Sequence, residues 1–255
     1  MNTPLSWLRD YVDVALPAEA IADKLTRAGN EVERITTIGD VWDHIVVGHV
    51  VGVERVPRAE RLLLTHVDVG DHTAKIITAA TNVAAGQYVP VALPGAQLGH
   101  GAERVIIEPR TFSGVTSEGM LCSGWELGIS DDADGIHIFG ERAEPGTPLR
   151  ELAADTVLEF AITPNRADCL SMIGIAREVA ALTGSHLRVP EVVVHEGGGT
   201  VDGAYGVEIA APDLCARYVA RLVREVTVGP SPEWLARRLR AAGLPVISNV
   251  VDVTN

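Results

Sequence analysis

Apolar positions in the first forty residues change from helical to strand spacing. A short helix is expected near Ser6–Tyr11. A second helix is expected after Pro17, because proline suits a first helical turn and the next apolar residues recur at helical spacing. These residues are Ile21, Ala22, Leu25 and Ala28. Gly29 ends this helix, and apolar residues across 32–38 then indicate a strand.

The middle of the chain, from about residue 41 to 150, is rich in short β-type runs. Gly, Pro, Asn and Asp turns separate the runs, and no long helical pattern interrupts them. The expected strands are Ile45–Val56, Leu62–Val69, Lys75–Ala79, Tyr88–Leu93, Arg104–Glu108 and Ile136–Phe139. Five or six such strands predict a small closed barrel.

Helical character returns after the β-rich region. A strand is expected at Thr156–Ile162, followed by a loop at Thr163–Asp168. A helix with one apolar side then runs to Gly184. Its spaced positions are Leu170, Ile173, Ala176, Arg177, Ala180 and Leu182. The Gly-rich residues 191–206 indicate a domain boundary.

The last segment predicts a strand, a helix and a further strand. Arg217–Val228 alternates as a strand does. Ser231 is a suitable N-cap and Pro232 a suitable first helical residue, and Gly243 ends that helix. Residues 246–255 are expected to form an apolar strand that needs neighbours, so we expect the chain to stop within a domain.

Composition restricts the class of protein. The chain has 255 residues, of which 47% are hydrophobic, enough for one large core or two modest ones. No run of 18 apolar residues exists and the N-terminus lacks a signal-peptide pattern, so we expect no membrane association. The cysteines Cys122, Cys169 and Cys215 form no C-x-x-C pair, which favours reduced thiols in a cytoplasmic protein.

Net charge argues against broad binding to nucleic acid. The formal charge is −13, and residues 44–150 carry eight Lys or Arg against thirteen Asp or Glu. Non-specific binding needs many cations that displace counterions from phosphate. A local contact site is still compatible with this composition.

Several sequence blocks carry a family resemblance. They are PLSWLRDYV (Pro4–Val12), LTRAGNEVE (Leu25–Glu33), RLLLTHVDVG (Arg61–Gly70), NVAAGQYVPVALPGAQL (Asn82–Leu98), SEGMLCSGWELG (Ser117–Gly128), PNRADCLSMIGIAREVAALTG (Pro164–Gly184), GPSPEWLARRL (Gly229–Leu239) and NVVDVTN (Asn249–Asn255). In this order they resemble the start of the β subunit of bacterial phenylalanyl-tRNA synthetase, over nearly the whole chain. The middle blocks alone are less specific, because they resemble a tRNA-binding OB module found in several proteins.

The resemblance implies an α+β architecture. Residues 1–40 plus 151–200 would form a discontinuous N-terminal α/β domain, and an OB-fold barrel of the tRNA-binding type would be inserted at 41–150. Residues 207–255 would be the truncated start of an α+β editing-type domain. The remaining editing residues would lie beyond Asn255.

The resemblance also implies a role in an ATP-dependent aminoacyl-tRNA synthetase, phenylalanine–tRNA ligase. This chain would be a non-catalytic part that scaffolds the α subunit within an α₂β₂ heterotetramer and contacts tRNA. It would bind no cofactor itself, while the whole enzyme uses ATP and Mg²⁺. Two alternatives stay open: a free-standing OB-type tRNA-binding protein, and a truncated regulator that binds the α subunit.

Four cations of the barrel are the candidate tRNA-phosphate contacts: Arg61, Lys75, Arg104 and Arg110. The alternative is that they are solvated surface residues and that the barrel packs against other subunits. Three departures from the family weaken tRNA contact more than they weaken the fold. The turn Val56–Leu62 lacks the usual His-Pro, Thr78–Asn82 lacks the usual Cys-Gly-Ala type turn, and Ser113 replaces a common Arg.

Two further clusters invite a chemical interpretation. Ser117, Glu118, Met120, Cys122 and Ser123 contain possible nucleophiles, but no His lies nearby in sequence, so we favour a turn that closes the barrel and expect no catalytic residue. Asn165, Arg166 and Asp168 could bind substrate, but we favour a structural motif in which Asp168 caps the next helix and Arg166 pairs with a carboxylate. The eight histidines, among them His44, His49, His66, His72 and His100, lack metal-ligand spacing, so we expect no metal site.

Overall fold

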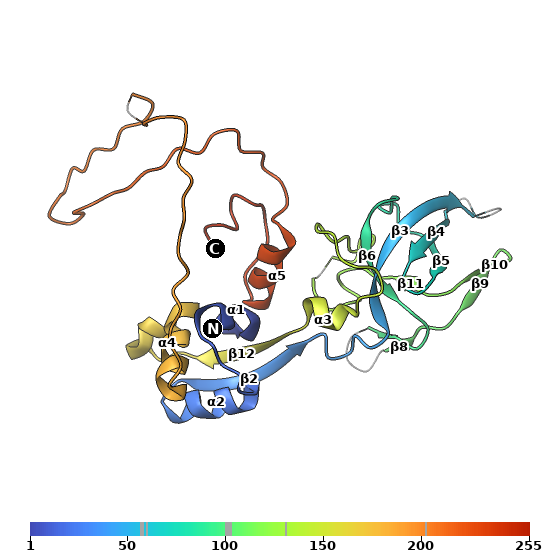
Figure 1. The fold of residues 1–255 in the computed structure, drawn as a ribbon, viewed down its shortest axis with the longest axis horizontal. Coiled ribbons are helices and arrows are strands. Elements are labelled where there is room, and N and C mark those ends of the chain that lie inside the picture. Colours follow the sequence, from blue (N-terminus) through green and yellow to red (C-terminus); the bar gives the residue numbers. More distant parts are fainter. Residues whose placement is uncertain (57–58, 60, 100–103, 131, 202) are drawn as a thin grey trace.

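The structure is a computed structural model that describes residues 1–56, 59, 61–99, 104–130, 132–201 and 203–255. Part of the Val56–Leu62 turn, at residues 57, 58 and 60, lies outside the described residues, and so does His100. Figure 1 shows a sheet with several helices at one end of the molecule and a β-rich body at the other.

Segments from the two ends of the chain share one antiparallel sheet. Its strands are β1 (Asn2–Pro4), β12 (Asp155–Ala161) and β2 (Glu31–Ile38), in that order. Three helices contribute to the same core as Leu158 and Phe160 of β12: α1 (Leu5–Tyr11), α2 (Ala18–Arg27) and α4 (Met172–Thr183). The β-rich body enters the chain between β2 and β12, so residues far apart in sequence meet across this sheet (Figure 1).

Local sequence signals set the ends of these helices. The predicted helices are confirmed, and Ile21, Ala22 and Leu25 are the buried positions of α2. Gly29 and Gly184 follow α2 and α4 with φ of +92° and +73°, a conformation that glycine adopts without strain. The expected cap at Asp168 is wrong. Ser171 caps α4 instead, because its Oγ accepts a hydrogen bond from the Gly174 amide at 3.1 Å.

The β-rich body is a curled antiparallel sheet of an OB-like fold, and the chain as a whole mixes α and β structure. The sheet order is β11-β6-β3-β4-β5. Its strands are β3 (Ile45–Arg55), β4 (Leu63–Asp68), β5 (Thr73–Thr78), β6 (Tyr88–Ala92) and β11 (Met120–Leu121). Two hairpins flank it, β7 (Gln97–Leu98) with β8 (Val105–Ile106), and β9 (Arg110–Phe112) with β10 (Val115–Ser117). Alternate residues such as Val67 and Ile76 are fully buried inside the barrel.

Two expected barrel strands differ from the structure. Arg104–Glu108 shrinks to Val105–Ile106, and Ile136–Phe139 is no strand, since only Phe139 forms a single bridge, to Tyr88. The Asn82 side chain explains the second difference. Its Oδ1 accepts from the Ile136 amide and its Nδ2 donates to the Ile136 carbonyl, at 3.0 and 2.9 Å, so a side chain satisfies backbone groups that a ladder would otherwise pair.

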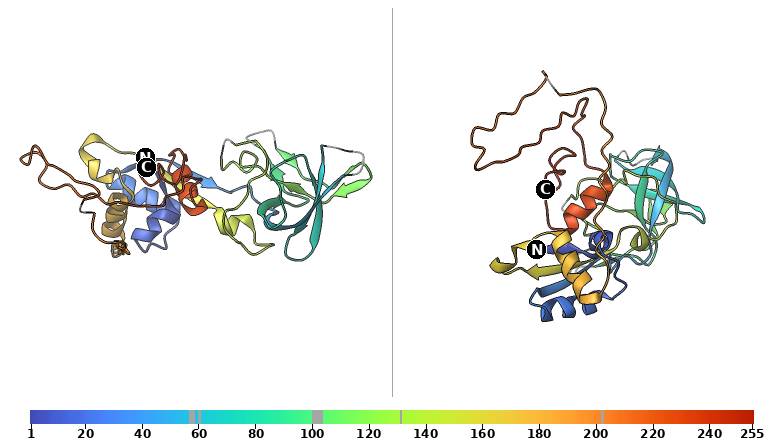
Figure 2. Two further views of the ribbon diagram at one scale, coloured as in Figure 1. Left: turned by 90° about the horizontal axis from the view of Figure 1, so that it is seen from above. Right: turned by 60° about the vertical axis from the view of Figure 1, so that its left-hand side comes forward.

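Three short helical elements complete the structure. They are α3 (Leu149–Ala153), the 3₁₀ helix η1 (Pro164–Cys169) and α5 (Glu233–Ala241). Both views in Figure 2 place α5 against the end that carries α1 and close to the barrel. Arg238 of α5 donates to Asp10 Oδ2 at 2.6 Å, which fixes α5 to the end of α1. Within the described ranges, no helix is long and apolar enough to cross a membrane.

The C-terminal quarter contains the largest departures from expectation. Arg217–Val228 forms no strand within the described chain, and its apolar residues, such as Val223 at 74% exposure, lack a partner strand. Ser231 does not cap α5, because its Oγ donates to Asp252 Oδ2 at 2.5 Å. Residues 246–255 form no strand, and residues 249–253 form turns, since the buried Asp252 accepts from the Ile247 amide at 2.8 Å.

Candidate nucleic-acid interface on the barrel

The barrel is closed by side chains rather than by a continuous ladder. Ser117 Oγ accepts from the Ile77 amide and donates to the Gly119 carbonyl, each at 2.9 Å. Glu118 Oε2 accepts from the Lys75 amide at 2.7 Å, and the Glu118 amide donates back to the Lys75 carbonyl. Two neighbouring residues therefore satisfy backbone groups on the outer edge of β5.

These contacts agree with the interpretation of the Ser117–Ser123 segment as a closing turn. A Cβ on Gly119 would lie 2.6 Å from the Ala92 carbonyl oxygen, so glycine is required by the close approach. Burial raises the pKa of the Cys122 thiol far above its ordinary value, which keeps it a neutral core group. Ser123 Oγ donates to Glu126 Oε2 at 2.9 Å, within its own turn.

Lys75 and Arg110 both lie on strands that meet at the Ser117–Glu118 seam. Lys75 lies on β5, beside the seam that Ser117 and Glu118 form. Arg110 lies on β9 and is directly opposite Ser117 of β10, whose Oγ binds the Ile77 amide of β5. Both cations are exposed, and no ion pair is found for either within the residues that the structure describes.

Arg61 and Arg104 lie elsewhere on the barrel. Arg61 is exposed just before β4, at the connection from β3. Arg104 is exposed just before β8, which belongs to a separate two-stranded sheet. Figure 1 shows β8 at the lower end of the barrel, while the β9–β10 hairpin extends from its side. The four expected contacts therefore do not form one continuous patch.

Phe112 adds an aromatic group next to Arg110. Residues two apart on a strand share a face, so Phe112 and Arg110 lie on the same side of β9. Phe112 is 40% exposed, which is enough to offer a ring face to a base. This pairing could have been predicted from the alternation in Arg110–Phe112, had the strand itself been expected.

The surroundings of this patch are mixed in charge. Lys75 is opposite His66 on β4, and His66 Nε2 lies 2.9 Å from Glu54 Oε1. The Glu118 carboxylate also lies at the patch, bound to the Lys75 amide. The cationic area is therefore small and suits one or two phosphates rather than a long backbone.

The PNRADC segment forms a compact ionic network. Arg166 Nη2 lies 3.0 Å from Asp168 Oδ2 and 2.8 Å from Glu178 Oε1, and 3.0 Å from Cys169 Sγ. Asn30, from the other half of the sheet domain, donates to Glu178 Oε2 at 3.2 Å. The bond from Arg166 holds the pKa of Asp168 below its ordinary value, while burial raises the pKa of Cys169.

This network gives the segment a structural explanation. Arg166 joins η1 to α4 through Glu178, and Asn30 extends the network to the turn between α2 and β2. Asn165 is exposed on η1 and takes no part in these bonds. Among the described residues, the acidic and thiol groups of Asp168, Cys169 and Glu178 are close enough to share a cation, and the Arg166 guanidinium contacts all three.

Comparison with known proteins finds matches both for the barrel and for the C-terminal segment of the chain. Residues 45–148 match the family model "Putative tRNA binding domain", and residues 214–255 match the "B3/4 domain". The chain is 47% identical over its whole length to a protein named phenylalanine–tRNA ligase beta subunit from Moorella thermoacetica. It is 44% identical, again over 100% of the chain, to the protein of the same name from Syntrophus aciditrophicus.

The chain spans about a third of the length of these relatives, 32% in both cases. A solved structure, the MetRS-related protein from Pyrococcus horikoshii, is 22% identical, and the match covers 40% of this chain and 85% of that one. Its TM-score of 0.30 is too low to support an argument. The two domain matches and the full-length identity together show that the chain belongs with the N-terminal portion of phenylalanine–tRNA ligase β subunits.

Proposed function

We propose that the chain acts as the non-catalytic N-terminal part of a phenylalanine–tRNA ligase β subunit. In the whole cytoplasmic enzyme, an α₂β₂ assembly would charge phenylalanine tRNA with the use of ATP and Mg²⁺, and this chain would scaffold the α subunit. The observation that supports the proposal best is the identity of 44–47% over 100% of the chain, flanks as well as barrel. A free-standing tRNA-binding barrel would need only the region matched by the tRNA-binding family model, residues 45–148.

The proposed domain arrangement follows the same relatives. Residues 1–40 and 151–200 would form one domain, with the barrel at 41–150 inserted and an editing-type domain beginning near 207. The pairing of β12 with both β1 and β2 supports the first part of this arrangement. The B3/4 match at 214–255 supports the last part.

Within this role, the Lys75–Arg110–Phe112 side of the barrel would contact tRNA locally. Lys75 on β5 and Arg110 on β9 are exposed and form no ion pair among the described residues, and the half-exposed Phe112 lies on the same face of β9 as Arg110; these observations support this assignment. Phosphate would be held by the cations and an unstacked base by the ring. The acidic balance of the barrel limits the contact to one short stretch of single strand.

Filter binding of phenylalanine tRNA across a salt series tests the contact. Each phosphate contact contributes a slope of about 0.7 to 0.9 in log K against log salt, so the double variant Lys75→Gln with Arg110→Gln should lose about 1.4 to 1.8 of the slope. Arg177→Gln, an exposed cation on α4, is the matched control and should leave the slope unchanged. An identical slope in the double variant and the parent would reject this patch as the contact.

Two assays test the scaffold role. The chain should co-purify with a phenylalanine–tRNA ligase α subunit, because burial of apolar faces between subunits drives assembly. The chain alone should catalyse no phenylalanine-dependent pyrophosphate exchange. Failure to co-purify would remove the scaffold role, and exchange by the chain alone would contradict its non-catalytic assignment.

A further inference from the structure

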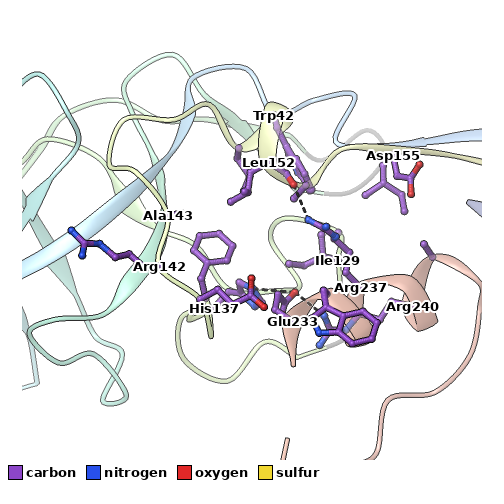
Figure 3. A pocket seen from close by; sticks show the side chains of 18 residues that line it. Trp42, Ile129, His137, Arg142, Ala143, Leu152, Asp155, Glu233, Arg237 and Arg240 are labelled. Carbon is purple, nitrogen blue, oxygen red and sulfur yellow. Dashed lines mark hydrogen bonds and ion pairs between the residues drawn. The ribbon is translucent and has the colours of Figure 1, made fainter. Parts of the chain in front are cut away.

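A cavity lies where the barrel, α3 and α5 meet. Its volume is about 230 Å³, and Figure 3 shows it enclosed by the barrel loop that carries His137, by Leu152 of α3 and by α5. None of the groups proposed above to contact tRNA lines it. The cavity is therefore separate from the barrel patch.

The walls of the cavity are mainly apolar and include several aromatic rings. Trp42 and Leu149 form the floor and are 2% and 1% exposed, and Phe139 adds a second ring. At the rim, Leu152 and Trp234 are 38% and 49% exposed, so apolar surface faces the opening. Such walls favour a ligand whose main part is apolar.

The size of the cavity suits a single aromatic ring. An apolar cavity of about 150 Å³ in a protein core accepts benzene, so a space of this volume can hold one ring with a short substituent. Rings also prefer edge and offset contacts with other rings, as His137 and Phe139 already show at a centroid distance of 5.2 Å and 80°. Trp42, Phe139 and Trp234 would provide such contacts.

Most of the charges around the cavity are already matched. Asp155 accepts from the Ser6 amide at 3.1 Å and from Ser6 Oγ at 2.5 Å. Glu233 Oε1 lies 3.3 Å from Arg240 Nη1 and 3.9 Å from His137 Nε2. Glu141 and Arg142 are consecutive exposed residues of opposite charge, and Figure 3 shows Arg142 directed away from the cavity.

Arg237 is the remaining cation at the cavity. It reaches from α5 towards α3, where its Nη1 donates to the Leu152 carbonyl at 2.7 Å (Figure 3). That acceptor is a neutral carbonyl, and in the described part of the chain no carboxylate pairs with this guanidinium. Its other donors can bind an anion in the planar fork geometry that suits a carboxylate.

We propose that this cavity is a binding site for a small aromatic carboxylate. The ring lies between Trp42 and Phe139, and the carboxylate lies on Arg237 at the opening. Because the site includes barrel, α3 and α5 residues, its ligand fixes the barrel relative to α5 and adds to the contacts that already hold α5 in place.

Ligand-observed NMR with 3-phenylpropionate and the full 255-residue chain tests the proposal. A ligand of this size is expected to bind with a Kd on the order of 1 mM. Its ring protons should receive saturation transfer from the protein, and the indole N–H of Trp42 should shift. Ala143→Phe, which fills the cavity from the loop, should abolish both signals while the far-UV circular dichroism stays unchanged.

Arg237→Gln distinguishes the contribution of the ligand's carboxylate to binding from that of its ring. This change should weaken 3-phenylpropionate about tenfold but leave the neutral 3-phenylpropanol unaffected, because a charge-assisted hydrogen bond is lost. Arg177→Gln on α4 should change neither. An absence of transfer to the parent chain at ten times the expected Kd would overturn the proposal, as would unaltered binding to a folded Ala143→Phe variant.

Discussion

Replacing Ser117 with alanine should open the closing seam of the barrel. The Ser117 hydroxyl is the acceptor for the Ile77 amide at 2.9 Å, and Ser117 itself is only 4% exposed. Alanine removes this acceptor and also the bond to the Gly119 carbonyl. The edge of β5 then retains the Glu118 contacts at Lys75 but loses its partner at Ile77.

The expected magnitude follows from the unpaired amide. A buried donor that loses its partner costs about 1 to 3 kcal/mol. Since about 1.4 kcal/mol corresponds to a factor of ten, exchange of the Ile77 amide with solvent should accelerate by about 5-fold to 150-fold. The effect should concentrate on β5, because the remaining strands keep their ladders.

Amide hydrogen exchange measured by NMR, residue by residue, is the assay. Ser185→Ala is the matched control, since Ser185 lies after α4 and its Oγ accepts from Thr183 at 3.0 Å, far from the seam in the fold. Exchange at Ile77 that is unchanged in Ser117→Ala would refute the reasoning. Acceleration spread evenly over the whole chain would refute it as well, because that would indicate global destabilisation.

Three further predictions concern the glycine of the seam, the junction and the sheet. Gly119→Ala should lower the free energy of unfolding by about 1 to 3 kcal/mol in urea titration, because its Cβ would lie 2.6 Å from the Ala92 carbonyl oxygen; Gly140→Ala, where no atom lies within 4 Å, should be neutral. Burial, opposed by the Glu233 charge, lowers the pKa of His137 below its ordinary 6.5, so the folded state favours the neutral ring and stability is lost as pH falls below that value. The urea midpoint of His137→Gln should therefore fall less than that of the parent between pH 7.5 and 5.5, and equal falls would contradict the assignment. Leu158→Ala, at a fully buried site of β12, should cost about 2 to 5 kcal/mol in the same titration, and a loss below 1 kcal/mol would show that β12 is not central to this core.

The sequence by itself determined the elements whose signals are local. The spacing of Ile21, Ala22 and Leu25 predicted α2, and Gly29 and Gly184 marked helix ends that the structure shows with positive φ. Alternating apolar runs predicted β3, β4, β5 and β6 within a few residues of their bounds. These signals are readable because periodicity and φ preference act within one or two turns of chain.

Only the tertiary structure decided which distant groups satisfy one another. Arg166 could be predicted to pair with a carboxylate, but its partnership with Glu178 depends on α4 packing beside η1. Asn82 takes the place of a ladder at Ile136, and Asp252 takes the Ser231 hydroxyl that had been expected to cap α5. In each case a side chain binds a group at least twelve residues away in sequence, and the periodicity of the sequence carries no information about such pairs.

The C-terminal quarter shows that a strand-like sequence pattern does not suffice to form a strand. Residues 217–228 alternate as a strand does, yet a strand forms only where another edge can pair with its amides and carbonyls. No such edge lies beside these residues in the described chain, and Val223 is 74% exposed. The cavity at Arg237 likewise exists only because α5, α3 and a barrel loop converge. The hydrophobic pattern of a segment limits which secondary structures it can adopt. The segments that pack against it decide which one forms, because the stabilising contacts are made between segments rather than within them.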